Sequence, residues 1–148
     1  MKYFLVLLSA LVLLWACNDE IAGLDTKTDL QKDHLQKEIQ LNEGKKWTAD
    51  ESTKNNVHLL EQVIKNNQPG SDTTLGPYKI VAGELQAGLD KLVSECRMKG
   101  ADHDALHVWL EPLMAKVKNL KQTENKKEAV SIYTDVAGEI QIFNQIFE

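Results

Sequence analysis

Residues 77–96, PYKIVAGELQAGLDKLVSEC, indicate the fold of this chain most clearly. Their apolar side chains recur every three or four residues, which places them along one face of a helix: Tyr78, Val81, Leu85, Leu89 and Leu92. Pro77 suits the first turn of such a helix, and Gly100 suits the position just after its end. The pattern therefore predicts an amphipathic helix that starts near Pro77 and brings Cys96 onto its buried face.

The segments on either side have the same periodicity. Asp50 is a suitable N-cap for a preceding helix that the sequence Asn66–Gly70 ends. Asp102 can cap a following helix, whose inner face we predict to be His103, Leu106, His107, Leu110, Met114, Val117 and Leu120. A last helix is predicted from about Glu124 to Phe147. Because each helix can bury its apolar face only against the others, residues 41–148 are predicted to form an all-α, antiparallel four-helix bundle, with Trp47 packed on it.

The start of the chain has a different character. Lys2 precedes the apolar run Tyr3–Leu14, which has the length of the apolar region of a signal peptide and is too short for a permanent membrane helix. The run ends in LWAC (Leu14–Cys17), which resembles the lipobox of bacterial lipoproteins. That resemblance implies that residues 1–16 are removed as a signal peptide and that Cys17 becomes a lipid-bearing first residue.

Residues 17–40 are polar and charged and have no aromatic side chain, so they are predicted to form a flexible tether. The acidic sequence Asn18-Asp19-Glu20 resembles an export tag of lipoproteins in Bacteroidota-type bacteria. The protein is therefore expected in the cell envelope, lipid-anchored and at the outer membrane, with an envelope protein as a possible partner.

Composition and missing motifs exclude several classes of function. The chain carries a formal net charge of −5 and has no basic patch, so it is not expected to bind nucleic acid. It contains no glycine-rich phosphate loop, nucleophile elbow or Cys-x-x-Cys pair. We therefore expect neither an enzyme nor a nucleotide cofactor.

One group of residues has potential chemistry. Cys96, Met98, His103 and His107 lie within a dozen residues, and the two histidines are one helical turn apart, so that both imidazoles could bind one ion. Thiolate, thioether and imidazole together suit copper, whereas zinc would use Cys96, His103 and His107 with a water or a carboxylate. The sequence predicts a transition-metal site, with copper favoured over zinc.

The same segment, C-x-M-x-G-x-x-H-x-x-x-H over residues 96–107, resembles a stretch found in small uncharacterised helical envelope proteins of Bacteroidota-type bacteria. That resemblance implies a fold and a site location but no reaction. An alternative stays open, in which Cys96, His103 and His107 are core residues of a structural or protein-interaction lipoprotein.

Overall fold

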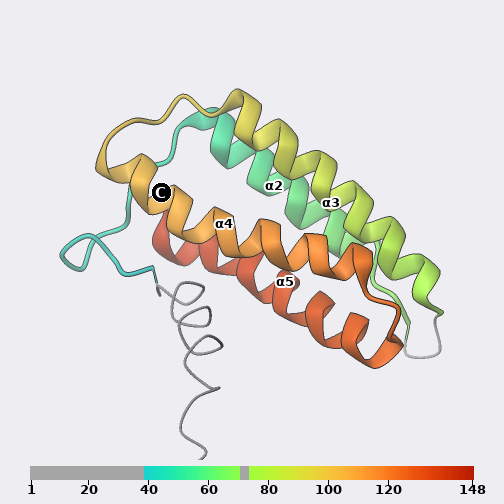
Figure 1. The fold of residues 1–148 in the computed structure, drawn as a ribbon. Helices are drawn as coiled ribbons and strands as arrows, with labels where there is room; N and C mark the ends of the chain where they lie inside the picture. Colours follow the sequence, from blue (N-terminus) through green and yellow to red (C-terminus); the bar gives the residue numbers. More distant parts are fainter. Residues whose placement is uncertain (1–38, 71–73) are drawn as a thin grey trace, which may run out of the picture.

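The computed structural model describes residues 39–70 and 74–148. These residues form four helices, labelled as in Figure 1: α2 (Glu51–Asn66), α3 (Leu75–Glu95), α4 (Ala101–Gln122) and α5 (Lys126–Ile146). Consecutive helices are in contact, α5 closes the ring by contacting α2, and α3 also contacts α5 across the centre. Figure 1 shows neighbouring helices running in opposite directions. The predicted all-α, antiparallel four-helix bundle is confirmed.

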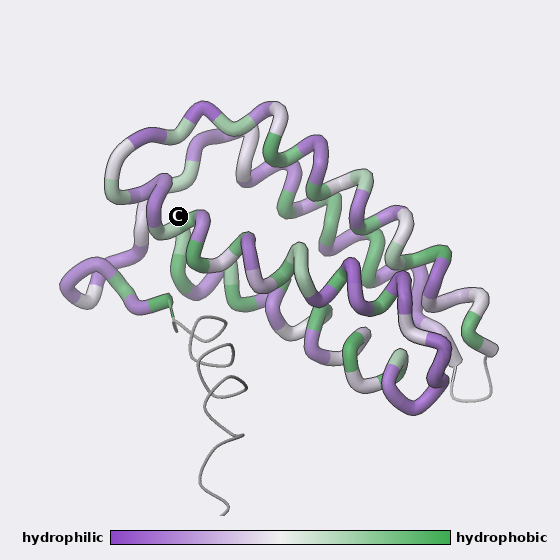
Figure 2. Tube along the Cα trace, viewed as in Figure 1, coloured by the Kyte–Doolittle hydropathy of each residue, from purple (hydrophilic) through white to green (hydrophobic). Residues whose placement is uncertain are grey.

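Each helix buries one apolar face, as the spacing predicted. Hydrophobic and hydrophilic residues alternate along every helix in Figure 2, and the hydrophobic ones meet in a shared core. Leu60 from α2, Leu85 and Leu89 from α3, and Leu113 from α4 are completely buried there. Burying a leucine side chain contributes about 1.5–3 kcal/mol, so the stability of the bundle comes mainly from this core.

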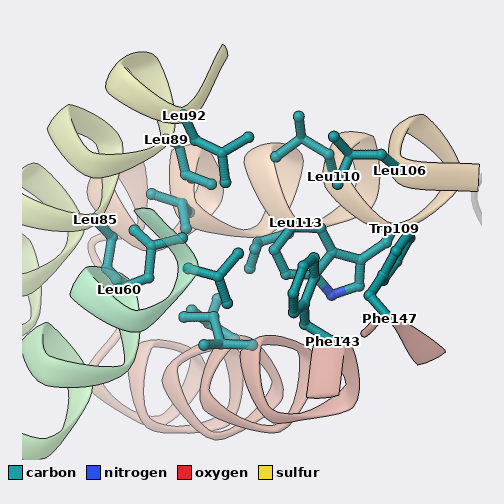
Figure 3. Packing of buried hydrophobic residues seen from close by; sticks show 14 of the residues in the cluster. Leu60, Leu85, Leu89, Leu92, Leu106, Trp109, Leu110, Leu113, Phe143 and Phe147 are labelled. Atoms are coloured by element: carbon teal, nitrogen blue, oxygen red, sulfur yellow. The ribbon is translucent and has the colours of Figure 1, made fainter. Parts of the chain in front are cut away.

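Aromatic side chains fill the part of the core between α4 and α5 (Figure 3). The Trp109 ring lies 5.0 Å from that of Phe143, and Phe143 stacks on Phe147 at 4.7 Å. The buried Trp109 indole N–H donates a hydrogen bond to the Glu139 carbonyl oxygen at 2.8 Å. The polar atom of this side chain is thereby satisfied inside the core.

Helix ends differ from the prediction at three places. Helix α3 begins at Leu75, so Pro77 lies in the third helical position, and α5 begins at Lys126 after its N-cap Asn125. Gly100 does not close α3: that helix ends at Glu95, and Gly100 is the N-cap of α4 with a φ of 69°. Glycine reaches positive φ without steric cost, and here it turns the chain into α4.

Residues 39–50, which we call the arm, precede α2 and pack on one end of the bundle. The predicted packing of Trp47 is confirmed, because its side chain is half-buried against the core. Ile39, the first described residue, also contacts the core. The predicted signal peptide, Cys17 and the tether up to residue 38 lie outside the described residues.

Candidate functional site

The predicted metal-binding residues lie at the end of the bundle where α3 passes into α4, and the arm and the C-terminus lie at this same end (Figure 1). Cys96 is the C-cap of α3, with the extended backbone angles φ −59° and ψ 131°. Residues 97–100, which we call the site turn, connect it to α4. The site turn is therefore short and non-helical between two long helices.

Cys96 and Met98 both pack against the main core cluster and are half-buried. Cys96 is a free thiol in the described residues. Its predicted position on the buried stripe of α3 is approximately right, although the residue caps the helix rather than continuing it. Packing alone is enough to account for both side chains.

The two histidines are brought together. Their ring centroids are 4.6 Å apart and the ring planes are nearly perpendicular, at 88°. His103 is half-buried, whereas the His107 side chain is 50% exposed. One turn further along α4, Glu111 Oε1 lies 3.2 Å from His107 Nδ1. An imidazole pair and a carboxylate therefore follow one another along one side of α4.

The predicted inner face of α4 was wrong at His107. The buried residues of this helix are Ala105, Leu106, Trp109, Leu110, Leu113, Val117 and Leu120. Successive helical residues are rotated by about 100°, so His107 lies about 100° from Leu106, at the edge of the buried face. The large Trp109 side chain packs on α5 and rotates the buried face away from His107, and Met114 is only half-buried for the same reason.

The structure does not assemble a complete ligand set. Within residues 39–70 and 74–148, no three His, Cys, Asp or Glu side chains are close enough together to hold a metal ion. The imidazole pair is formed, but Cys96 does not join it. A metal site here requires movement of the thiol or of the site turn.

Sequence reasoning missed the role of Asp50 in this region. As predicted, Asp50 caps α2: its Oδ1 atom accepts hydrogen bonds from the Thr53 N–H at 2.7 Å and the Ser52 hydroxyl at 3.0 Å. Its Oδ2 atom accepts a further hydrogen bond, at 2.7 Å, from the backbone N–H of Arg97. Burial by itself raises the pKa of Asp50, but these hydrogen bonds from Thr53, Arg97 and Ser52 outweigh it and lower the pKa from 3.8 to about 2.

Asp102 does not cap α4, contrary to prediction, because the N-cap is Gly100 and makes no side-chain hydrogen bond. Asp102 lies in the first turn of α4, and its Oδ1 atom accepts the backbone N–H of Thr48 at 3.0 Å. A carboxylate in the first turn also interacts favourably with the helix dipole. Asp102 therefore ties α4 to the arm.

Comparisons of the chain with models of known protein families, with curated proteins and with solved structures find no match. No helix in the described ranges is long and apolar enough to cross a membrane.

Proposed function

We propose that the protein is a lipid-anchored envelope protein that binds one transition-metal ion, copper in preference to zinc. His103 and His107 are the two central ligands, Cys96 is the third, and Met98 is a weaker fourth ligand. The lipid on Cys17 holds the domain at the outer membrane. The site binds metal and catalyses no reaction.

The observation that carries this proposal is the imidazole pair next to Glu111. A carboxylate accepts a hydrogen bond only from a protonated nitrogen, so Glu111 favours the His107 tautomer with its proton on Nδ1. That tautomer keeps the lone pair on Nε2 free for a metal. Metal-binding histidines commonly have such a carboxylate partner, which fixes the tautomer and makes the ring a stronger ligand.

The sulfur ligands favour copper. Soft thiolate and thioether ligands select Cu(I), while imidazole accepts both copper and zinc. Cys96 lies outside helical backbone, and residues 98–100 that follow are non-helical. The ligand set closes by rotation of the Cys96 side chain and adjustment of these residues, without breaking either helix.

A titration of the full-length protein tests the proposal. Reduced, metal-free protein in detergent is titrated with Cu(I), Cu(II) and Zn(II), and affinity is measured by competition with a chelator. We expect one ion per chain. His107→Ala should weaken binding at least about 100-fold, and Glu111→Gln about tenfold, as for loss of a ligand and of its carboxylate partner. With Cu(II), a thiolate charge-transfer band that disappears in Cys96→Ser would identify the sulfur ligand.

His58 on α2 provides the matched control. Its Nδ1 atom lies 3.4 Å from Glu61 Oε2, and its side chain is exposed, as at His107. It belongs to no close imidazole pair among the described residues. His58→Ala should therefore leave the affinity unchanged, and equal binding by wild type and His107→Ala would contradict the proposal.

A second candidate is a protein-interaction lipoprotein with no metal. The packing of Cys96 and Met98 on the core cluster supports it, because core residues need no further explanation. This second candidate is supported if the wild-type protein binds none of the three ions and Cys96 does not react with a thiol reagent in the folded state.

A further inference from the structure

Lysines gather at the end of the bundle opposite the imidazole pair. We call this end, residues 65–70, 74–80 and 116–130, the basic end. Figure 1 shows two of its parts together, the start of α3 and the turn from α4 into α5. The prediction of no basic patch is wrong here, because the lysines come from separate helices that only the fold brings together. The basic end contains two glutamates, Glu124 and Glu128, and seven lysines: Lys65, Lys79, Lys116, Lys118, Lys121, Lys126 and Lys127.

Most of these lysines have no carboxylate partner among the described residues. Lys79 pairs with Glu124, and Lys116 pairs with Glu139. The other five lysines are exposed, and none of them forms an ion pair within the described ranges. Like charges held near one another repel, so an anionic partner would relieve a repulsion that is present in the free protein.

Two exposed apolar side chains accompany the lysines. Ile80 on α3 is 62% exposed and Val130 on α5 is 41% exposed, and each lies in the second turn of its helix. The Cα–Cβ bonds of a helix tilt toward its N-terminus, and α3 and α5 both begin at this end. Ile80 and Val130 therefore lean toward the end of the bundle, beside Lys79 and Lys126. The basic end combines ammonium groups with apolar side chains.

We propose that the basic end docks the domain on an anionic lipid surface. The lysines lie on the lipid phosphate groups, and Ile80 and Val130 enter the headgroup boundary. Attraction of lysines to anionic lipids and shallow burial of apolar side chains together bind peripheral proteins to membranes. This inference goes beyond the proposed function and does not depend on a metal.

The composition of the basic end favours lipid over a nucleic acid. Single-stranded nucleic acids are bound by exposed aromatic rings, and planar arginine suits base and phosphate recognition. The described residues of the basic end include no arginine, and their one aromatic side chain, Tyr78, is 3% exposed. Lysine alone is a flexible point charge, which suits a fluid layer of headgroups.

Docking by the basic end determines which part of the domain points away from the lipid. His103 lies in the first turn of α4, and Lys121 lies in its last turn. At 1.5 Å per residue, these two positions are roughly 27 Å apart along the helix axis. The imidazole pair therefore remains in water when the basic end is on the lipid surface.

Lysine reactivity tests the docking. The full-length protein is reconstituted in vesicles of phosphatidylcholine with or without phosphatidylglycerol, and its lysines are modified with an amine-reactive reagent and quantified by mass spectrometry. We expect Lys118, Lys121, Lys126 and Lys127 to react at least about fivefold more slowly in the anionic vesicles. Lys45 and Lys99, at the opposite end, should react equally fast in both. High salt should remove the difference, because it screens exposed charges.

Matched variants separate the basic end from total charge. Lys118→Gln/Lys121→Gln should abolish most of the protection of Lys126 and Lys127, whereas Lys45→Gln/Lys99→Gln removes the same charge and should leave it unchanged. All four replaced lysines are exposed, so the fold should be kept, as circular dichroism can verify.

Apolar contact has its own variant pair. Ile80→Asp should reduce the protection in anionic vesicles. Leu59→Asp is the control, because Leu59 is 47% exposed but lies on α2 outside the basic end. It should change nothing.

Each outcome either supports or overturns the inference. Equal lysine reactivity in both kinds of vesicle overturns it, as does an equal loss of protection in the two double variants. Soluble polyglutamate and inorganic phosphate are added separately to the neutral vesicles. If either protects the lysines as well as phosphatidylglycerol does, the assignment to a lipid surface is overturned. No metal is used, so a failure of metal binding leaves this inference standing.

Discussion

The two ends of the bundle differ in the hydrogen bonds that their N-cap side chains accept. At each end one helix has a side-chain N-cap, Asp50 for α2 and Asn125 for α5. Asn125 Oδ1 accepts two N–H groups, from Lys127 and Glu128, both in its own helix. Asp50 gives one oxygen to its own helix and the other to the site turn. The N-cap Asn125 therefore makes these hydrogen bonds only within its own helix, whereas the N-cap Asp50 also makes a tertiary contact.

Non-local contacts at the far end include those of Tyr133, beside the pairs Asn67–Glu84 and Lys79–Glu124. The single proton of the Tyr133 hydroxyl is shared between the carbonyl oxygens of Ile64 and Asn67, both at 3.3 Å, and its ring lies edge-on to Tyr78 at 5.8 Å. Burial and then the neighbouring Tyr78 raise the pKa of Tyr133. This end contains no imidazole or thiol among its described residues.

Trp109→Ala should have the largest effect on the unfolding free energy. It also tests whether the two ends of the bundle fold separately. Trp109 is almost completely buried between α4 and α5. Replacing a buried tryptophan by alanine costs about 3–5 kcal/mol of unfolding free energy. Urea denaturation followed by circular dichroism should show a lower midpoint and a single transition. Two separate transitions would mean that the ends are independent units.

Exposed Leu59 on α2 provides the control for this measurement, because its side chain is 47% exposed. Leu59→Ala should change the unfolding free energy by less than about 0.5 kcal/mol, as is usual for surface positions.

Acid should weaken the site end through Asp50. The folded-state pKa of about 2 lies below the value of 3.8 that the carboxyl has when unperturbed, so the ionised form stabilises the fold. Its stabilising contribution is complete above about pH 4 and is lost as the pH falls toward 2. Unfolding free energies measured across this range should fall less steeply in Asp50→Asn than in the wild type. Parallel curves would show that Asp50 is not responsible.

Tyr133→Phe should have the smallest effect, confined to the far end. It removes one hydroxyl donor, whose proton is shared between two acceptors, and keeps the ring packing, so the expected loss of unfolding free energy is about 0.5–1.5 kcal/mol. A thermal melt measures this loss, and Cu(I) affinity should stay at the wild-type value. A drop in affinity would contradict this expectation and would show that the far end influences the proposed site through the core.

The sequence alone determined the four helices. Apolar residues spaced three and four apart, as in Leu85, Leu89 and Leu92, can be buried only by a helix with one inward face, so the bundle followed from local periodicity. Asp50 is recognisable as an N-cap from the sequence, since the capping hydrogen bond from Thr53 is made within the first turn of its own helix. The closeness of His103 and His107 also follows from helical spacing.

Tertiary structure decided which way α4 faces and what Asp50 does with its second oxygen. His107 was placed inward because its spacing fits an apolar stripe, but the packing of Trp109 against Phe143 sets the rotation of the helix. The hydrogen bond from the Arg97 N–H to Asp50 Oδ2 joins residues 47 positions apart, and no local sequence pattern encodes such a contact. Periodicity describes how residues are arranged around one helix axis, whereas rotation, helix ends and partners across the bundle depend on which packing fills the core best.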